Sequence, residues 1–308
     1  MHFYAILPAF LTAVSAHGVV ISVEGANGVS MPGLTIADGT PRDCSSNGCG
    51  SQADTAIIRD RELGTDRASA LGRTQGNGPV DASVMIANFL GTSGGANVPT
   101  NNASSAGVGV EDDLSGLNRA GRNNNRKQKK RQLGNLLGGL FGGGGIGGGL
   151  GGGNSGNKAD KPAESSVAAT AGEGASSGLP TCSESGEITM TYRQANGAGP
   201  MTADIDATSG GTDVNAFQSA EVTENVPGFG IQGLSLATNT DFPLTVKMPA
   251  GMTCEGSVGG AENVCIVRVR NGAAAGPFGG SAAFTQSASA RKRAIAFRLK
   301  KRMQIVRN

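Results

Sequence analysis

The sequence has no tryptophan, two tyrosines and two histidines among 308 residues. Only 16 % of its residues are charged and 4 % are aromatic. No apolar run reaches the roughly 18 residues of a membrane-spanning helix, so we expect no integral membrane segment. Two histidines exclude a His-rich metal site and argue against Ser-His-Asp or Cys-His catalysis. The few aromatic rings leave little material for a sugar-binding platform, which argues against a glycoside hydrolase.

Glycine is abundant instead, with 51 residues. The bias is concentrated in the middle of the chain, where residues 119–131 hold seven basic residues and no acid, and residues 138–153 hold twelve glycines. Such compositions cannot bury enough apolar surface to offset the loss of chain entropy. We therefore predict a disordered basic and Gly-rich insertion over residues 111–180.

The N-terminus has the pattern of a secretory signal peptide over residues 1–16. Residues 3–14 are apolar, and Val14 and Ala16 place small residues where signal peptidase requires them. Cleavage between Ala16 and His17 would make His17 the first residue of a secreted, extracellular protein. The alternative is a buried N-terminal strand.

Cysteine usage also fits an oxidising compartment. Local disulfides could join Cys44 with Cys49 and Cys254 with Cys265, which would leave Cys182 unpaired. Sequence alone does not give the connectivity, and a zinc site is a weaker alternative because the spacing and the histidine count are unsuitable.

Three positions suggest modification. Asn102 begins an N-glycosylation signal. Arg131 and Arg293 each end a run of three basic residues, which predicts proteolytic processing in the secretory pathway. The alternative for each run is a solvated stretch of charge.

The remaining residues alternate between apolar and polar side chains, as antiparallel strands with one buried face do. We expect two halves of one antiparallel β-sandwich of immunoglobulin or fibronectin type, residues 17–110 and 181–290. Strands are predicted over 17–24, 187–193, 242–248 and 264–270 and around 283–285. Short helices are predicted around 55–62 and over 81–90, the latter with Asp81 as the N-cap.

Charge is distributed unevenly. Residues 119–131 and the basic tail, 291–308, carry 15 of the 26 Lys and Arg residues, so the rest of the chain is near −13. An acidic body argues against a nucleic-acid partner. In the tail, Ile295, Leu299 and Met303 have helical spacing, but Ile295, Phe297 and Leu299 also alternate as in a strand.

Several segments resemble the fungal Egh-like virulence-factor family, secreted appressorium-associated proteins that include the MAS cell-surface proteins. The segments are HGVVISVEGANG, RDCSSNGCGSQADTAIIRDRE, GRTQGNGPVDASVMIANFLG, KKRQLGNLLGGLFGGGG and NGAAAGPFGG. The resemblance implies a virulence-associated role at the cell surface. We expect the protein to bind cell-wall polysaccharide or a host surface component without catalysis, and we assign no catalytic residue.

His17-Gly18 also resembles the start of copper-dependent lytic polysaccharide monooxygenases, which are secreted β-sandwiches. A sandwich of their type is therefore the alternative to the immunoglobulin or fibronectin type. In that family the first histidine chelates copper, so the resemblance makes His17 a candidate copper ligand and an oxidoreductase the alternative function. This chain lacks a second mature histidine, so an oxygen ligand such as Asp43, Asp54 or Asp81 would have to complete the site.

Overall fold

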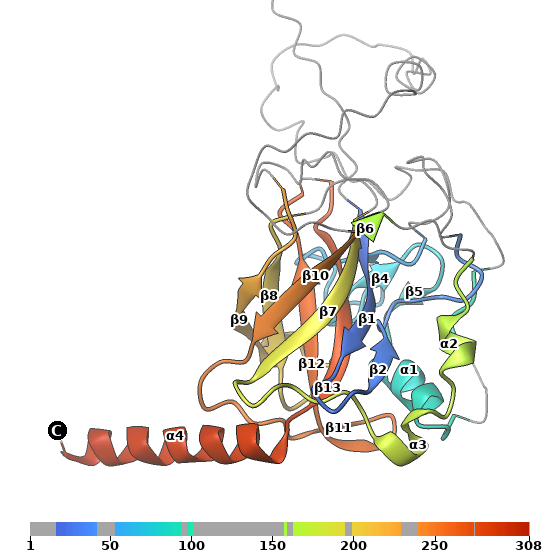
Figure 1. The fold of residues 1–308 in the computed structure, drawn as a ribbon. Helices are drawn as coiled ribbons and strands as arrows, with labels where there is room; N and C mark the ends of the chain where they lie inside the picture. Colours follow the sequence, from blue (N-terminus) through green and yellow to red (C-terminus); the bar gives the residue numbers. More distant parts are fainter. Residues whose placement is uncertain are drawn as a thin grey trace, which may run out of the picture.

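The computed structural model describes residues 17–41, 53–93, 98–101, 157–158, 163–194, 199–228, 240–273 and 275–307. The strands within these ranges (Figure 1) are β1 (Gly18–Glu24), β2 (Ser30–Pro32), β3 (Ala56–Ile57), β4 (Arg73–Thr74), β5 (Gly78–Pro79), β6 (Asn157–Lys158), β7 (Glu187–Gln194), β8 (Thr202–Asp206), β9 (Phe217–Glu224), β10 (Thr240–Lys247), β11 (Gly256–Val258), β12 (Ala261–Arg270) and β13 (Phe278–Thr285). The α-helices are α1 (Ala82–Phe89), α2 (Ser166–Ala169), α3 (Gly174–Ser177) and α4 (Ala288–Arg307).

The strands form one sheet that folds over into two packed layers. Its order is β2-β1-β7-β10-β9-β8-β12-β13-β3-β4-β5, and every neighbouring pair is antiparallel. Strand β9 pairs with β10 on one side and β8 on the other, so it joins the layers. The layers meet where β1 crosses β13: a Cβ added to Gly280 would lie 2.9 Å from the Val20 backbone nitrogen. The predicted β-sandwich is confirmed.

All five strands predicted from alternation are present as β1, β7, β10, β12 and β13. In β7 the apolar side chains Ile188, Met190 and Tyr192 are buried and the residues between them are half-buried. Strand β12 is buried continuously over Val264–Val269, because it lies between β8 and β13 near the centre of its layer. Apart from Arg268, these buried side chains belong to one main hydrophobic core.

One of the two predicted helices is confirmed. Helix α1 begins after Asp81, whose carboxylate accepts a hydrogen bond of 2.8 Å from the Ser83 backbone N–H, as an N-cap does. The helix predicted around 55–62 is wrong, because residues 56–57 form β3 and pair with β13. Ala56, Ile57 and Ile58 are all buried, so this segment lacks the exposed face that a surface helix presents.

Ordered structure extends into the segment for which disorder was expected. Helix α2 places Val167 in the core with no exposed surface. The Asp38 carboxylate accepts hydrogen bonds from the backbone N–H groups of Val167 (3.1 Å) and Ala168 (2.8 Å). The side chain of the N-cap residue Ser165 makes no capping hydrogen bond, and the neighbouring Glu164 carboxylate accepts from the Ser165 and Ser166 N–H groups, so a distant residue satisfies the next two. Most of residues 111–162 lie outside the described ranges.

The tail forms α4, so the helical spacing of its apolar residues, and not their strand-like alternation, corresponds to its structure. None of the described helices combines the length and hydropathy needed to cross a bilayer.

A disulfide joins Cys254 to Cys265 and ties the approach to β11 to strand β12. Cys182 is a free, buried thiol, and burial raises its pKa. Cys44 and Cys49 lie outside the described residues.

Candidate functional site at the His17 end of the sandwich

The described chain begins at His17, directly before β1. The register pairs Gly18 with Gln194, so His17 lies beside the end of β7. Its side chain is fully buried, and its ring centroid lies 4.0 Å from that of Phe278, with the two planes inclined by 30°. The first residue of the expected mature chain is therefore packed into the sandwich.

Gly18 is required by the close approach of a tyrosine ring. A Cβ at this position would lie 2.5 Å from the Tyr192 hydroxyl oxygen, too close for any larger residue. Tyr192 is fully buried, and its hydroxyl makes no hydrogen bond to the described residues. Burial raises the pKa of Tyr192, so the phenol is neutral at physiological pH.

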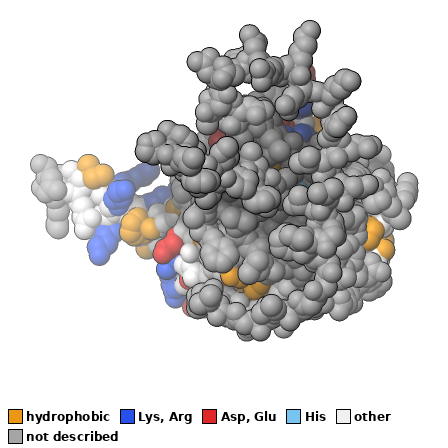
Figure 2. All heavy atoms as spheres, turned by 90° about the horizontal axis from the view of Figure 1, so that it is seen from above, with side chains coloured by type: hydrophobic (Ala, Val, Ile, Leu, Met, Phe, Trp, Pro, Cys, Tyr) orange, Lys and Arg blue, Asp and Glu red, His pale blue; other side chains and the backbone are white. Residues whose placement is uncertain are grey.

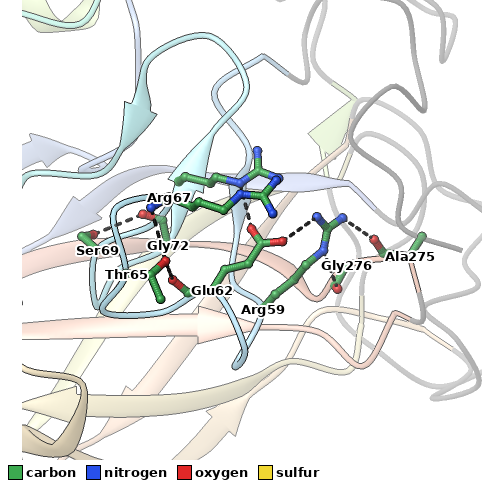
Figure 3. Close-up of polar contacts among 9 residues, drawn as sticks. Arg59, Glu62, Thr65, Arg67, Ser69, Gly72, Ala275 and Gly276 are labelled. Carbon is green, nitrogen blue, oxygen red and sulfur yellow. Dashed lines mark hydrogen bonds and ion pairs between the residues drawn. The ribbon is translucent and has the colours of Figure 1, made fainter. Parts of the chain in front are cut away.

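Phe278 is positioned by the loop that precedes β13. The Asn271 side-chain oxygen accepts hydrogen bonds from the backbone N–H groups of Ala273 (3.1 Å) and Phe278 (3.0 Å). The Arg59 guanidinium donates to the carbonyls of Ala275 (2.8 Å) and Gly276 (3.3 Å) (Figure 3). Both ends of the loop are thus held by side chains, and Arg59 links it to the segment that follows β3.

Glu62 is the counter-ion at the centre of this segment. Its carboxylate accepts a hydrogen bond of 3.2 Å from Arg59 and one of 2.9 Å from Arg73. Burial raises the pKa of Glu62, but the hydrogen bonds from Arg73 and Arg59 outweigh burial and hold the pKa below its usual value. Burial lowers the pKa of Arg59, because it disfavours the charged form of the guanidinium. Glu62 is therefore ionised and fully engaged as a structural group.

Four arginines lie within this segment, and we call Arg59, Arg61, Arg67 and Arg73 the arginine cluster. Arg67 is exposed and makes no ion pair with any described residue, whereas Arg59 and Arg73 share the single carboxylate of Glu62. Residues 59–73 hold these four arginines against three acids, Asp60, Glu62 and Asp66, so the segment carries one net positive charge.

A family model described as Egh16-like virulence factor matches residues 15–279. The chain belongs to this family. It is 54 % identical over 293 residues to the appressoria-specific virulence factor GAS2 of Pyricularia oryzae, covering 94 % of this chain and 90 % of that protein. It is 39 % identical over 134 residues to GAS1 of the same fungus, covering 42 % of this chain and 52 % of GAS1. No solved structure matches. The resemblance to the Egh-like family is confirmed, and with it the virulence-associated role.

The described residues of this Egh16-like protein do not by themselves fit the copper site suggested by His17. Within those ranges no three His, Cys, Asp or Glu side chains gather as a metal site requires. Asp54 is buried and accepts a hydrogen bond from the Ala37 N–H, and Asp81 caps α1. Asp43 lies outside the described residues. We derive no chemistry from copper.

The two acids of β8, Asp204 and Asp206, also have structural roles. Asp206 accepts backbone hydrogen bonds from Thr208 (2.8 Å), Ser209 (2.9 Å) and Gly211 (2.6 Å). Burial raises its pKa, but these bonds and the Ser209 hydroxyl outweigh burial and lower it. Asp204 pairs with Arg268 at 3.0 Å.

Of the predicted processing and modification positions, Arg293 lies on α4, where its guanidinium donates to the Glu184 carbonyl (3.0 Å) and carboxylate (3.1 Å). Ala16, Asn102 and Arg131 fall outside the described residues. Processing, glycosylation and signal cleavage stay predictions.

Sequence reasoning missed the arginine cluster and Glu62. The available signal was the alternation of opposite charges in residues 59–62, directly after the buried Ile57-Ile58 pair.

Proposed function

We propose that this Egh16-like protein is a secreted virulence factor that binds an anionic polymer of the cell wall or host surface through the arginine cluster, without catalysis. Secretion rests on the signal pattern of residues 1–16, and the one disulfide among the described residues, Cys254–Cys265, supports it. A carboxylated polysaccharide, rich in uronic acids, has the chemistry that guanidinium groups bind through paired hydrogen bonds.

The observation that carries the proposal is the position of Arg67. It is exposed, makes no ion pair with the described residues, and lies in a segment where arginines outnumber acids. Outside residues 119–131 and the tail, the chain has only eleven Lys and Arg residues against 24 acids. Residues 59–73 reverse this ratio, with four of the eleven basic residues against three of the acids. A cationic site on an otherwise acidic body selects anionic ligands.

The state of the acids supports binding over catalysis. A glycoside hydrolase needs a general acid with a raised pKa that faces a second carboxylate across the sugar. The pKa values of Glu62 and Asp206 are instead lowered by their hydrogen bonds, which outweigh burial. Both carboxylates are thus held ionised, as structural groups are.

The test is binding to polygalacturonate, with microcrystalline cellulose as the neutral polymer. We expect the secreted protein to bind polygalacturonate, and the double variant Arg61→Gln/Arg67→Gln to bind about three- to tenfold more weakly, since exposed ion pairs are each worth up to about 1 kcal/mol. The matched control is Lys247→Gln, which removes one charge from β10, six places from β4 in the strand order.

Equal affinity for cellulose and polygalacturonate would overturn the assignment of an anionic ligand. An equal effect of Lys247→Gln would show that net charge, and not the arginine cluster, governs binding. Release of shortened or oxidised oligosaccharides during the assay would contradict the absence of catalysis. Mass analysis of the secreted protein should find His17 as its first residue, and a chain that begins at Met1 would contradict secretion by this signal.

A further inference from the structure

Helix α4 projects away from the sandwich (Figure 1). It starts at Ala288, after β13, and its 20 residues span about 30 Å at 1.5 Å per residue. It lies outside residues 15–279, the range that the family model matches. Membership of the family therefore assigns no role to α4.

Only the first half of α4 rests on the body. Ala290 and Ala294 are 5 % and 9 % exposed, and Phe297 lies against Gly251, where an added Cβ would approach its ring to 3.1 Å. The Arg298 guanidinium donates to the Thr253 hydroxyl (3.1 Å). From residue 299 onwards the described part of the helix makes no hydrogen bond or ion pair with the body.

An exposed apolar stripe runs along α4. Ile295, Leu299 and Met303 are 40 %, 53 % and 63 % exposed and are spaced four residues apart. At 100° per residue, this spacing puts them on one face of the helix, opposite the face of Ala290 and Ala294 that packs on the body. Phe297 and Ile305, the two other exposed large hydrophobic side chains among the described residues, also lie on this helix but on the face of Ala290 and Ala294.

Positive charge surrounds the stripe. Residues 288–307 contain eight Lys and Arg residues and no acid. Figure 2 shows blue basic and orange hydrophobic side chains together on this projecting part. Basic side chains that flank an apolar stripe can bury their stems beside it and keep their charges at a polar boundary.

We propose that α4 docks the protein onto an anionic lipid membrane by lying in the interface between headgroups and acyl chains. Charge complementarity points to an anionic partner, and the apolar stripe selects lipid among anionic partners, since lipid can bury Ile295, Leu299 and Met303. A nucleic acid or a soluble polyanion would meet the charges but leave the stripe in water. The acidic body is repelled by the same surface, so a helix that projects from it is a suitable contact.

The test is co-sedimentation of the full chain, with residues 288–308 verified by intact mass, with vesicles of 70 % phosphatidylcholine and 30 % phosphatidylserine. Vesicles of phosphatidylcholine alone are the comparison. We expect binding to the anionic vesicles and binding at least about tenfold weaker to the neutral ones, because each basic residue near such a surface adds attraction. Two exposed double variants separate the contributions: Leu299→Ser/Met303→Ser and Lys300→Glu/Lys301→Glu.

We expect both double variants to weaken binding to anionic vesicles by about tenfold or more while the far-ultraviolet spectrum stays that of the folded sandwich. Loss with Lys300→Glu/Lys301→Glu but not with Leu299→Ser/Met303→Ser would overturn membrane docking and indicate a soluble polyanion as the partner. Equal binding to neutral vesicles would also overturn it. Arg67→Gln should weaken binding to anionic vesicles far less than either α4 double variant does, so failure of polymer binding and failure of membrane docking are separable.

Discussion

Replacement of Glu62 by glutamine should destabilise the fold by about 3 kcal/mol. The change keeps the shape of the side chain but removes the charge that Arg59 and Arg73 share at 3.2 and 2.9 Å. Side-chain exposure is 5 % for Glu62 and 7 % for Arg59, so solvent screens this pair only slightly. Loss of one partner of a buried ion pair costs about 3–5 kcal/mol. The lower end applies because Arg59 keeps its hydrogen bonds to Ala275 and Gly276.

The measurement is the free energy of unfolding from urea titration at pH 7, followed by tyrosine fluorescence and circular dichroism. Glu262→Gln is the matched control, since Glu262 is exposed and bonds only to the Ser257 hydroxyl, at 2.7 Å. We expect the control to cost less than about 0.5 kcal/mol, as surface substitutions do. A Glu62→Gln variant within about 0.5 kcal/mol of the control would refute the stabilising role of this carboxylate.

The pH dependence provides a second test of the same group. Because the pKa of Glu62 is lower in the folded chain than in the unfolded one, the folded state binds protons less readily. The stabilisation is therefore fully present above the ordinary glutamate pKa of about 4.3 and is lost as pH falls through the lower folded value. The stability of the wild type should fall more steeply with acid below about pH 4 than that of Glu62→Gln. Parallel curves would contradict the lowered pKa.

Three further substitutions have defined outcomes. Asp206→Ala should cost about 3 kcal/mol or more in urea unfolding, because the buried N–H of Gly211 and the part-buried N–H groups of Thr208 and Ser209 lose their acceptor. Asp213→Ala removes two exposed bonds from Asn215 and should cost about 1 kcal/mol or less, and equal losses would contradict this account. Gly18→Ala should lower the melting temperature because its methyl group collides with the Tyr192 ring, and an unchanged temperature would contradict the close packing. Replacing Cys254 and its partner by serine should cost about 2–4 kcal/mol, and equal stability of the variant and the wild type would show that this disulfide contributes little.

The local sequence determined the elements whose periodicity is unambiguous. Strand β7 alternates between polar and apolar residues from Glu187 to Tyr192, a pattern that a half-buried strand satisfies. Helix α1 carries its own N-cap in Asp81, and local hydrogen bonding suffices to start it. Composition alone also determined the uneven distribution of charge, including the excess of basic residues in the tail that forms α4.

Tertiary structure decided the elements whose local sequence favours more than one state. Residues 56–57 became β3 because Ile57 pairs with Phe278, more than 200 residues later, and a strand buried on both sides has no amphipathic period to reveal it. Helix α2 is capped by Asp38, which no local pattern predicts.

The candidate site depended most on tertiary structure. His17 was noticeable from its place after the signal, but its burial against Phe278 follows from the loop that Arg59 holds through Ala275 and Gly276. The sequence by itself supplied the charges of residues 59–73, and only the fold decided which of them neutralise each other and which, as at Arg67, remain exposed. The physical reason is that pairing of charges depends on distances of a few ångströms between segments far apart in the chain.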